Sequence, residues 1–353
     1  MNRKYIFGLI LIVGMIAGMT TPNAIATEIE FSGLKIAFDI SHKDSYYASN
    51  YVPLIANLTG AGNEVIFIND TWGIPDDVDA LFLTQPNDDY TEFELNDFYC
   101  WFKQGGKLLW VAGDSDFASY NIHSPNGVLE KLGAFSRIAS ISIEDPEYND
   151  GSAYRTAATE IGYGDVLYDE LAIALTTGMT AGCIFHGPTA IMAFDGTYYK
   201  DLRYGESVFP QRINVIMTYG RNATALDSDV SDGWGADNYA EETSLDLYAN
   251  VTGVAGEGGV DPVGFFPAIV HENMTKFDGD IIVSGEAIYS FYKNMYDQNT
   301  ENGAYNGGVH FGQVLVNNIL NYFLESAPDE TTAFVLIPLG VIGVIYAISR
   351  RKK

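Results

Sequence analysis

Polar residues follow three apolar runs in the first third of the chain, and their types suit hydrogen bonding to a small ligand. Carboxylate, amide, hydroxyl and imidazole groups come directly after each run, in the sets Asp39, Ser41 and His42; Gln85 and Asn87; and Asp114 and Ser115. In open α/β sheets, ligands bind beyond the carboxyl ends of parallel strands. If the three runs are such strands, these side chains meet at one edge of the sheet, and we predict a polar binding pocket there.

A serine nucleophile is the enzymatic alternative at this edge. The segment Gly113–Phe117 reads Gly-Asp-Ser-Asp-Phe, which departs from the nucleophile elbow G-x-S-x-G because Phe117 replaces the last glycine. Two flanking carboxylates also disfavour an alkoxide at Ser115. A hydrolase would use Ser115, or a His/Asp pair drawn from His42, His186, Asp39 and Asp114.

A candidate calcium loop lies later in the chain. Asp227, Asp229 and Asp232 precede Gly233, but this spacing differs by one residue from the calcium-loop pattern D-x-[DN]-x-[DN]-G. A solvated acidic loop explains the same residues without a metal. We therefore expect no bound cofactor, with calcium as the alternative.

Strand-like and helix-like segments alternate along the first half of the chain. We expect strands at Gly33–Ile40, Glu64–Ile68, Ala80–Thr84, Lys107–Ala112, Arg137–Ile143, Ala181–Phe185, Thr189–Phe194, Ile213–Tyr219, Pro267–Val270 and Asp280–Ser284. We expect helices at Tyr46–Leu58, Thr91–Lys103, Pro125–Leu132, Glu286–Tyr296 and Val309–Glu325. Asp145–Gly164 reads as irregular, and 223–263 as a long Gly-, Asp- and Asn-rich loop. This order predicts an α/β fold with a mostly parallel sheet, helices on both faces and a long irregular insertion.

Three segments carry a resemblance to a known family. Lys35-Ile-Ala-Phe-Asp39, Leu81-Phe-Leu-Thr-Gln-Pro86 and Phe102-Lys-Gln-Gly-Gly-Lys-Leu-Leu-Trp-Val-Ala-Gly-Asp114 resemble the class I glutamine amidotransferase-like superfamily, in its non-catalytic surface and transporter-associated branch. The similarity covers about 33–117, and Gly303–Phe323 is similar to that branch's closing helix. The resemblance implies a flavodoxin-like sheet. The family's enzymes carry a Cys nucleophile after the fourth strand, where this chain has Ala112 or Ser115. Glutamine hydrolysis by a thiolate is therefore not expected.

Both ends of the chain are hydrophobic. Residues 1–26 have the basic, apolar and small-residue regions of a signal peptide. Residues 333–349 are uncharged, and 350–353 are basic, which indicates a membrane helix with a cytoplasmic tail. Such a helix spans about 25 Å, near the lower limit for a bilayer, so a processed sorting signal is the alternative. The sequence thus predicts an extracytoplasmic domain at 27–326, a stalk at 327–332 and a single-pass anchor in the cell membrane.

The amino-acid composition agrees with an extracytoplasmic location of the domain. The formal net charge is −27, which disfavours nucleic acid as a partner. Cys100 and Cys183 are the two cysteines, and whether they pair stays open. Five Asn-x-Ser/Thr sequons predict N-glycosylation at Asn57, Asn69, Asn222, Asn250 and Asn273.

These observations favour a membrane-anchored, glycosylated, non-enzymatic domain that binds a small molecule, glycan or protein partner at the cell envelope. The surface hydrolase described above is one alternative. The other is a structural envelope or adhesion component, in which the domain acts as an acidic spacer.

Overall fold

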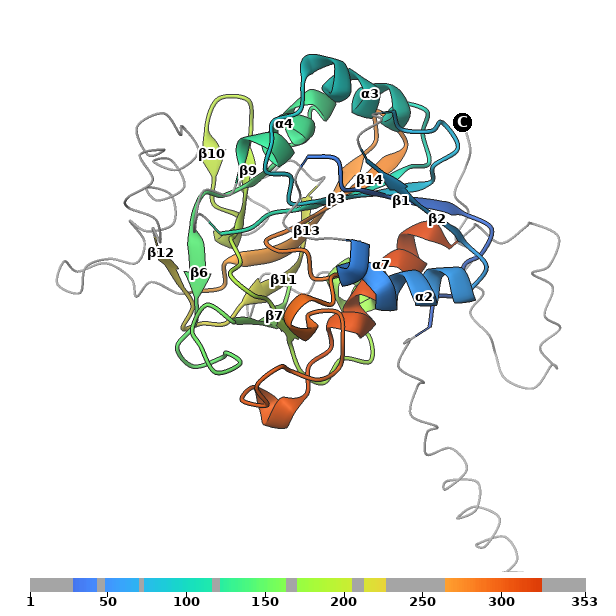
Figure 1. The fold of residues 1–353 in the computed structure, drawn as a ribbon. Helices are drawn as coiled ribbons and strands as arrows, with labels where there is room; N and C mark the ends of the chain where they lie inside the picture. Colours follow the sequence, from blue (N-terminus) through green and yellow to red (C-terminus); the bar gives the residue numbers. More distant parts are fainter. Residues whose placement is uncertain are drawn as a thin grey trace, which may run out of the picture.

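A nine-stranded mixed sheet forms the centre of the protein (Figure 1). The computed structural model describes residues 28–42, 48–69, 73–115, 121–162, 170–204, 213–226 and 264–325. Across the sheet the strands are β2 (Glu64–Ile68), β1 (Lys35–Asp39), β3 (Ala80–Thr84), β4 (Leu108–Ala112), β14 (Gly279–Ser284), β13 (Pro267–Met274), β11 (Ile213–Tyr219), β7 (Ala157–Ile161) and β8 (Cys183–Ile184). The α/β class expected from the sequence is confirmed.

The sheet has a parallel half and an antiparallel half. Neighbouring strands are parallel from β2 through β1, β3 and β4 to β14. From β14 through β13, β11 and β7 to β8 every neighbouring pair is antiparallel. Seven of the nine strands therefore run in one direction, in agreement with the expectation of a mostly parallel sheet.

Helices cover both faces of the parallel half. They are α2 (Val52–Gly60), α3 (Glu92–Phe102), α4 (His123–Leu132) and α7 (Gly312–Leu324), whereas α5 (Glu170–Leu175) packs on β11 in the antiparallel half. Figure 1 shows α3 and α4 on one face and α2 and α7 on the other. Alternate strand residues point to opposite faces. Accordingly, Phe38 packs in the core beneath α2 and α7, whereas its neighbour Ala37 packs in the core beneath α3 and α4.

Two small sheets and several short helical turns complete the described part. One small sheet has the order β10 (Tyr199–Lys200), β9 (Ile191–Phe194) and β5 (Ser136–Ile138), and the other pairs β12 (Thr224–Leu226) with β6 (Ser142–Glu144). The 3-10 turns are η1 (Ala48–Tyr51), η3 (Leu202–Tyr204), η5 (Tyr292–Asn294) and η6 (Asn306–Gly308).

Four expectations about secondary structure are wrong. The loop expected at 223–263 begins with β12, and its remainder, 227–263, lies outside the described residues. The single strand expected at Arg137–Ile143 is two strands, β5 and β6, which belong to different sheets. The irregular segment Asp145–Gly164 contains β7, a member of the main sheet. The helix expected at Glu286–Tyr296 is the short turn η5, because Lys293 adopts φ +50° and Asn294 φ +62°, which an α-helix cannot contain.

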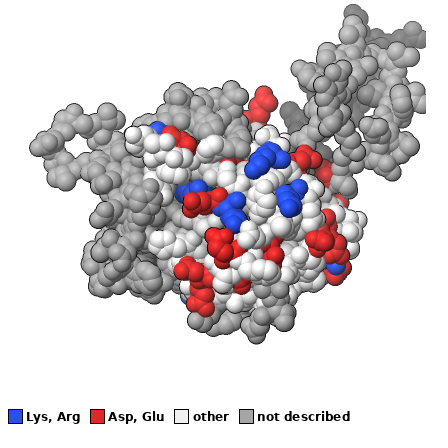
Figure 2. All heavy atoms as spheres, turned by 90° about the horizontal axis from the view of Figure 1, so that it is seen from above, with Lys and Arg blue, Asp and Glu red and all other residues white. Residues whose placement is uncertain are grey.

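Charges of both signs share the face that carries α3 and α4. Figure 2 shows Lys and Arg side chains lying among Asp and Glu on this face. One such pair joins the two helices, with Lys131 Nζ 2.9 Å from Glu92 Oε2. The predicted signal, stalk, anchor and tail all lie outside the described residues. Within the described ranges, no helix has the length and apolar character needed to cross a bilayer.

Candidate functional site at the carboxyl ends of the parallel strands

Asp39 anchors the first group of polar residues, at the end of β1. Its side chain is fully buried and accepts hydrogen bonds from Ser41 Oγ (2.6 Å), the Ser41 backbone N–H (2.9 Å) and Tyr90 Oη (2.6 Å). Burial raises the pKa of Asp39, and the hydrogen bonds from Ser41 and Tyr90 act against this rise. Asp39 therefore orders the residues around it.

His42 connects β1 to the start of α3. Its Nδ1 lies 2.6 Å from Ser41 Oγ, its Nε2 lies 3.3 Å from Glu94 Oε1, and its ring lies 4.2 Å from the Tyr90 ring. Glu94 also completes the capping box of α3, where its carboxylate accepts from the backbone N–H of Thr91 (2.7 Å). Burial raises the pKa of Glu94, but the Thr91 hydrogen bonds and the charge of His42 outweigh it, so the net shift is downward.

Gln85 joins β3 to β4 and β14. Its Nε2 donates to the Gly113 carbonyl (2.5 Å) and to Glu286 Oε1 (2.5 Å). Its Oε1 is buried and has no hydrogen-bond partner among the described residues. Gln85 also adopts φ +57°, a strained conformation for a residue other than glycine, which costs about 1–3 kcal/mol. Such strain is concentrated at binding sites, where the surrounding contacts hold it in place.

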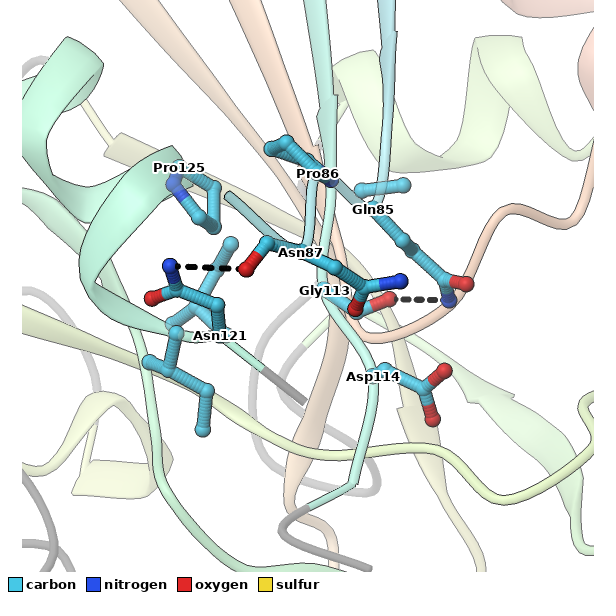
Figure 3. A pocket seen from close by; sticks show the side chains of 10 residues that line it. Gln85, Pro86, Asn87, Gly113, Asp114, Asn121 and Pro125 are labelled. Carbon is cyan, nitrogen blue, oxygen red and sulfur yellow. Dashed lines mark hydrogen bonds between the residues drawn. The ribbon is translucent and has the colours of Figure 1, made fainter. Parts of the chain in front are cut away.

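A pocket lies between these strand ends and α4 (Figure 3). It has a volume of about 230 Å³, which includes space open to solvent. Its polar lining consists of Gln85, Asn87, Asp114 and Asn121, and Asn121 Nδ2 donates to the Asn87 carbonyl (3.2 Å). Figure 3 shows Asn87, Asn121 and Asp114 around the same space. The apolar wall includes Ile122, Pro125 and Ile138.

Asp114 and Ser115 follow β4 at the edge of this pocket. The Ser115 backbone N–H donates to Asp114 Oδ1 (2.7 Å) and to the Gly187 carbonyl (2.9 Å), and Ser115 is only 2% exposed. Gly113 is required here, because a Cβ would lie 2.7 Å from Ile138 Cγ2. The turn therefore packs tightly against the segment that follows β8.

The structure brings most of the predicted residues together. Backbone N–H groups of Asn87 and Asp88 donate to the His42 carbonyl (2.9 and 3.1 Å), and Thr84 Oγ1 donates to the Asp39 carbonyl (2.9 Å). These bonds place the Asp39–His42 group beside the pocket. His186 lies next to Gly187, but its ring packs edge-on against Tyr154 and Tyr292. It is therefore a neighbour of the pocket and does not line it.

Sequence reasoning missed Asn121, Tyr90, Glu94 and Glu286. Glu286 follows β14, whose parallel place beside β4 could not be deduced because the two strands are far apart in the sequence. It also stood at the start of a wrongly expected helix. Glu94 carried a usable signal, since Thr91 three residues earlier completes a capping-box pattern.

Metal and modification sites are only partly covered by the structure. Asp227, Asp229 and Asp232 lie outside the described residues, and no group of three or more metal-ligating side chains occurs within them. Of the sequon asparagines, Asn69, Asn222 and Asn273 are exposed, and Asn250 lies outside the described ranges. Asn57 is half-buried, and its Nδ2 donates to Tyr296 Oη (2.8 Å).

Comparison with known proteins finds a solved structure with a similar fold. No family model matches the chain, and no curated protein matches it. A solved structure titled "mmIFT52 N-terminal domain" aligns with a TM-score of 0.51 and 9% identity over 82% of this chain and 96% of that one. The exo-beta-1,4-mannosidase Op5Man5 from Opitutaceae bacterium strain TAV5 aligns with a TM-score of 0.33 and 11% identity, over 72% of this chain and 31% of that one. At these identities the first likeness concerns the fold alone, and the second is too low to use.

Proposed function

We propose that this protein is a membrane-anchored extracytoplasmic domain that binds a small hydroxyl-rich ligand, such as the end of a cell-envelope glycan, without transforming it. The observation that carries the proposal is the pocket beyond β3 and β4. It combines three amide side chains, one carboxylate and an apolar wall. Sugars present alternating hydroxyl groups and apolar C–H faces, and this lining offers partners for both.

The hydrogen-bonding capacity of the pocket suits neutral hydroxyls. The Asn87 side chain can both donate and accept, and the Asp114 carboxylate accepts. Asn121 shapes the wall, because its Nδ2 already donates to the Asn87 carbonyl and to Asp89 Oδ1, and its Oδ1 accepts from the backbone N–H groups of His123 and Ser124. Gln85 Oε1 is a buried acceptor that a ligand hydroxyl would satisfy. The enclosed space is only about 10 Å³, the size of one water molecule, so one hydroxyl of a sugar or small polyol would enter it and the ring would lie outside.

The ends of the described domain support an anchored orientation. Asn321, near the end of α7, donates to the Glu28 carbonyl (3.0 Å) and accepts from the Glu30 N–H (2.9 Å). Asn63, before β2, donates to the Phe31 carbonyl (3.0 Å). The first described residues, 28–31, therefore lie between the end of α7 and the start of β2. In our proposal a membrane on that side leaves the pocket, at the opposite edge, facing outward.

Kinship with the amidotransferase-like superfamily is part of the proposal. The order β2-β1-β3-β4-β14 supports this, because it resembles the 2-1-3-4-5 order of flavodoxin-like sheets when β14 is counted as the fifth strand. The family's nucleophile position falls just after β4, whereas Cys100 lies on α3 and Cys183 on β8. Burial raises the pKa of the Cys183 thiol far above its ordinary value, which disfavours a thiolate there. These placements support a binding role over glutamine hydrolysis.

A hydrolase is the second candidate, because the side chains of Ser41, His42 and Glu94 interact in series, as in a catalytic triad. Ser41 Oγ lies 2.6 Å from His42 Nδ1, and His42 Nε2 lies 3.3 Å from Glu94 Oε1. However, Ser41 Oγ also donates to Asp39, whose carboxylate opposes an alkoxide at this oxygen. At Ser115, His186 is a poor base at neutral pH, since burial and the charges of Arg155 and Lys293 lower its pKa to about 4.

Ligand binding to the purified full chain tests the proposal. We expect monosaccharides and polyols to bind at millimolar concentration, measured by calorimetry and protein-observed NMR. Asn87→Ala should weaken binding by about two- to tenfold, as expected for one lost hydrogen bond. Asn96→Ala, an exposed asparagine on α3, is the matched control and should bind as the wild type does.

Two results would contradict a non-enzymatic binding domain. If no sugar or polyol bound, or if Asn87→Ala bound equally well, the pocket would not be the site, and a spacer role would be favoured. If the protein hydrolysed ester or glycoside substrates, and Ser41→Ala or Ser115→Ala abolished the turnover, the hydrolase alternative would be correct.

A further inference from the structure

Two exposed tyrosines frame the imidazole of His186. The ring of His186 lies 5.4 Å from the Tyr154 ring and 5.0 Å from the Tyr292 ring, with interplanar angles of 86° in both cases. Tyr154 is 44% exposed and Tyr292 is 37% exposed. Three segments distant in the sequence thus place aromatic side chains together at the surface, beside the strand-end pocket.

Two cations flank these tyrosines and share one carboxylate. Arg155 Nη1 forms an ion pair with Glu301, and Lys293 Nζ lies 3.0 Å from Glu301 Oε1. Arg155 Cζ lies 6.0 Å from the centre of the Tyr154 ring, and Lys293 Nζ lies 5.6 Å from that of Tyr292. Two positive charges against one negative charge leave a local positive excess, in a chain whose net charge is −27.

The nearby carboxylate of Asp150 is buried and pairs with neither cation, but its charge reduces this excess. Its two oxygens accept from the backbone N–H groups of Asn302 (2.9 Å) and Ala304 (3.0 Å). The Asp150 backbone N–H also donates to the Arg155 carbonyl (3.0 Å). Asp150 therefore holds the loop before η6 against the turn that carries Arg155.

Hydrogen-bonding capacity in this cluster is not used up within the described residues. Arg155 is only 9% exposed, yet its Nε has no hydrogen-bond partner among them. A buried guanidinium N–H without an acceptor is costly, by about 1–3 kcal/mol or more. Lys293 also holds a left-handed conformation (φ +50°), which is unfavourable for lysine and is typical of residues kept for binding.

We propose that Tyr154, His186 and Tyr292, with Arg155 and Lys293, form a second subsite that binds a carboxylate-bearing sugar ring. The tyrosine faces would pack on the apolar C–H face of the ring, and the two cations would bind the carboxylate. Arginine suits this group, because its planar N–H groups match a carboxylate. The subsite adjoins the pocket through Gly187, whose carbonyl accepts from the Ser115 N–H. This inference rests on the proposed glycan binding and narrows its ligand to an acidic glycan.

A matched pair of disaccharides tests the charge preference. One ligand contains glucuronate, and the other contains glucose at the same position. We expect the full chain to bind the acidic disaccharide about tenfold more tightly, measured by calorimetry at physiological salt. Arg155→Gln and Lys293→Gln should each remove most of this preference, whereas affinity for the neutral disaccharide should change less than twofold. Lys103→Gln, an exposed lysine beside Tyr99 on α3, is the matched control and should keep the full preference.

Glu301→Gln separates a ligand role from a structural one. If the cations serve a ligand, removing the competing carboxylate should strengthen acidic-disaccharide binding several-fold. If the cluster only stabilises the fold, the same change should weaken binding or leave it unchanged, and that outcome would overturn the subsite. In the wild type, NMR titration of His186 gives a readout without mutation. A bound carboxylate should raise the pKa of this imidazole from about 4, because it offsets the two nearby cations.

The two proposals fail in different ways. If the neutral disaccharide binds and depends on Asn87, but the acidic one binds no better, the subsite is wrong and the pocket stands. Preference for a sulfated disaccharide over the glucuronate one would also overturn the carboxylate assignment. If neither disaccharide binds, both proposals are wrong.

Discussion

The two halves of the nine-stranded sheet are stabilised in different ways. In the parallel half, buried aromatic rings stack from strand to strand, with Phe38 4.6 Å from Phe82 and Phe82 5.7 Å from Trp110. In the antiparallel half, β11 shows register shifts against both of its neighbours. The parallel half therefore provides aligned strand ends for a pocket, whereas the antiparallel half is less regular although its core is also apolar.

A test of aromatic packing in the parallel half should give the largest effect. Trp110 is fully buried, donates from Nε1 to Ser284 Oγ (2.9 Å), and lies 5.2 Å from the Tyr289 ring. We expect Trp110→Ala to lower the free energy of unfolding by about 3–5 kcal/mol, measured by chemical denaturation. Ile216→Val, at a fully buried position of β11, should cost only about 0.5–1.5 kcal/mol. If both variants lost the same free energy of unfolding, the stacked rings would not stabilise the parallel half more than an ordinary aliphatic residue stabilises the antiparallel half.

The stability of the antiparallel half should depend on a buried carboxylate. Glu272 on β13 is fully buried and accepts from the backbone N–H groups of Phe135 (2.8 Å) and Ser136 (2.8 Å) and from Ser136 Oγ (2.8 Å). Glu272→Ala leaves these donors unpaired, so we expect a loss of about 2–3 kcal/mol in the same assay. Glu272→Gln keeps one acceptor oxygen and should lose less. A smaller loss for Ala than for Gln would contradict this role.

The parallel half was also the more predictable one from the sequence. The strands expected at Glu64–Ile68 and Ala80–Thr84 match β2 and β3, because strands buried on both faces appear as continuous apolar runs. β7 was missed, since Ala157–Ile161 contains Thr and Glu and lies within a polar stretch. Its place in the sheet comes from pairing with the distant strand β11, which no local pattern reveals.

The same difference applies to the candidate site. Gln85, Asn87 and Asp114 could be grouped because parallel strands end at one edge, and all three line the pocket. Asn121 reaches the pocket from the start of α4, which depends on how that helix packs. His186 was a candidate catalytic residue, but it does not line the pocket, and its tyrosine neighbours come from two irregular segments that the sequence could not position.

A moderate, pH-dependent effect should arise where the antiparallel half meets the site. The folded-state pKa of His186, about 4, lies below its ordinary value of 6.5, so folding favours the neutral ring. The corresponding stability is present above about pH 6.5 and is lost as pH falls toward 4. In the His186→Gln variant, we expect the free energy of unfolding to fall less than in the wild type as the pH is lowered from 6.5 to 4. An unchanged slope in this variant would mean that the imidazole titrates as it does in the unfolded chain.

The smallest effect on stability should come from the two cysteines, of which one lies beside the parallel half and the other lies in the antiparallel half. Both are free thiols: Cys100 is exposed on α3 beside the parallel half, and Cys183 is buried on β8 at the antiparallel edge. A maleimide reagent should label one thiol per native chain, because burial raises the pKa of Cys183 and excludes the reagent. Cys100→Ser should remove that label and change the unfolding free energy by less than about 0.5 kcal/mol, as surface substitutions usually do. Rapid labelling of Cys183 in the native Cys100→Ser variant, at a rate above that of global unfolding, would show that the antiparallel edge opens locally. That result would make the difference between the two halves one of dynamics as well as of packing.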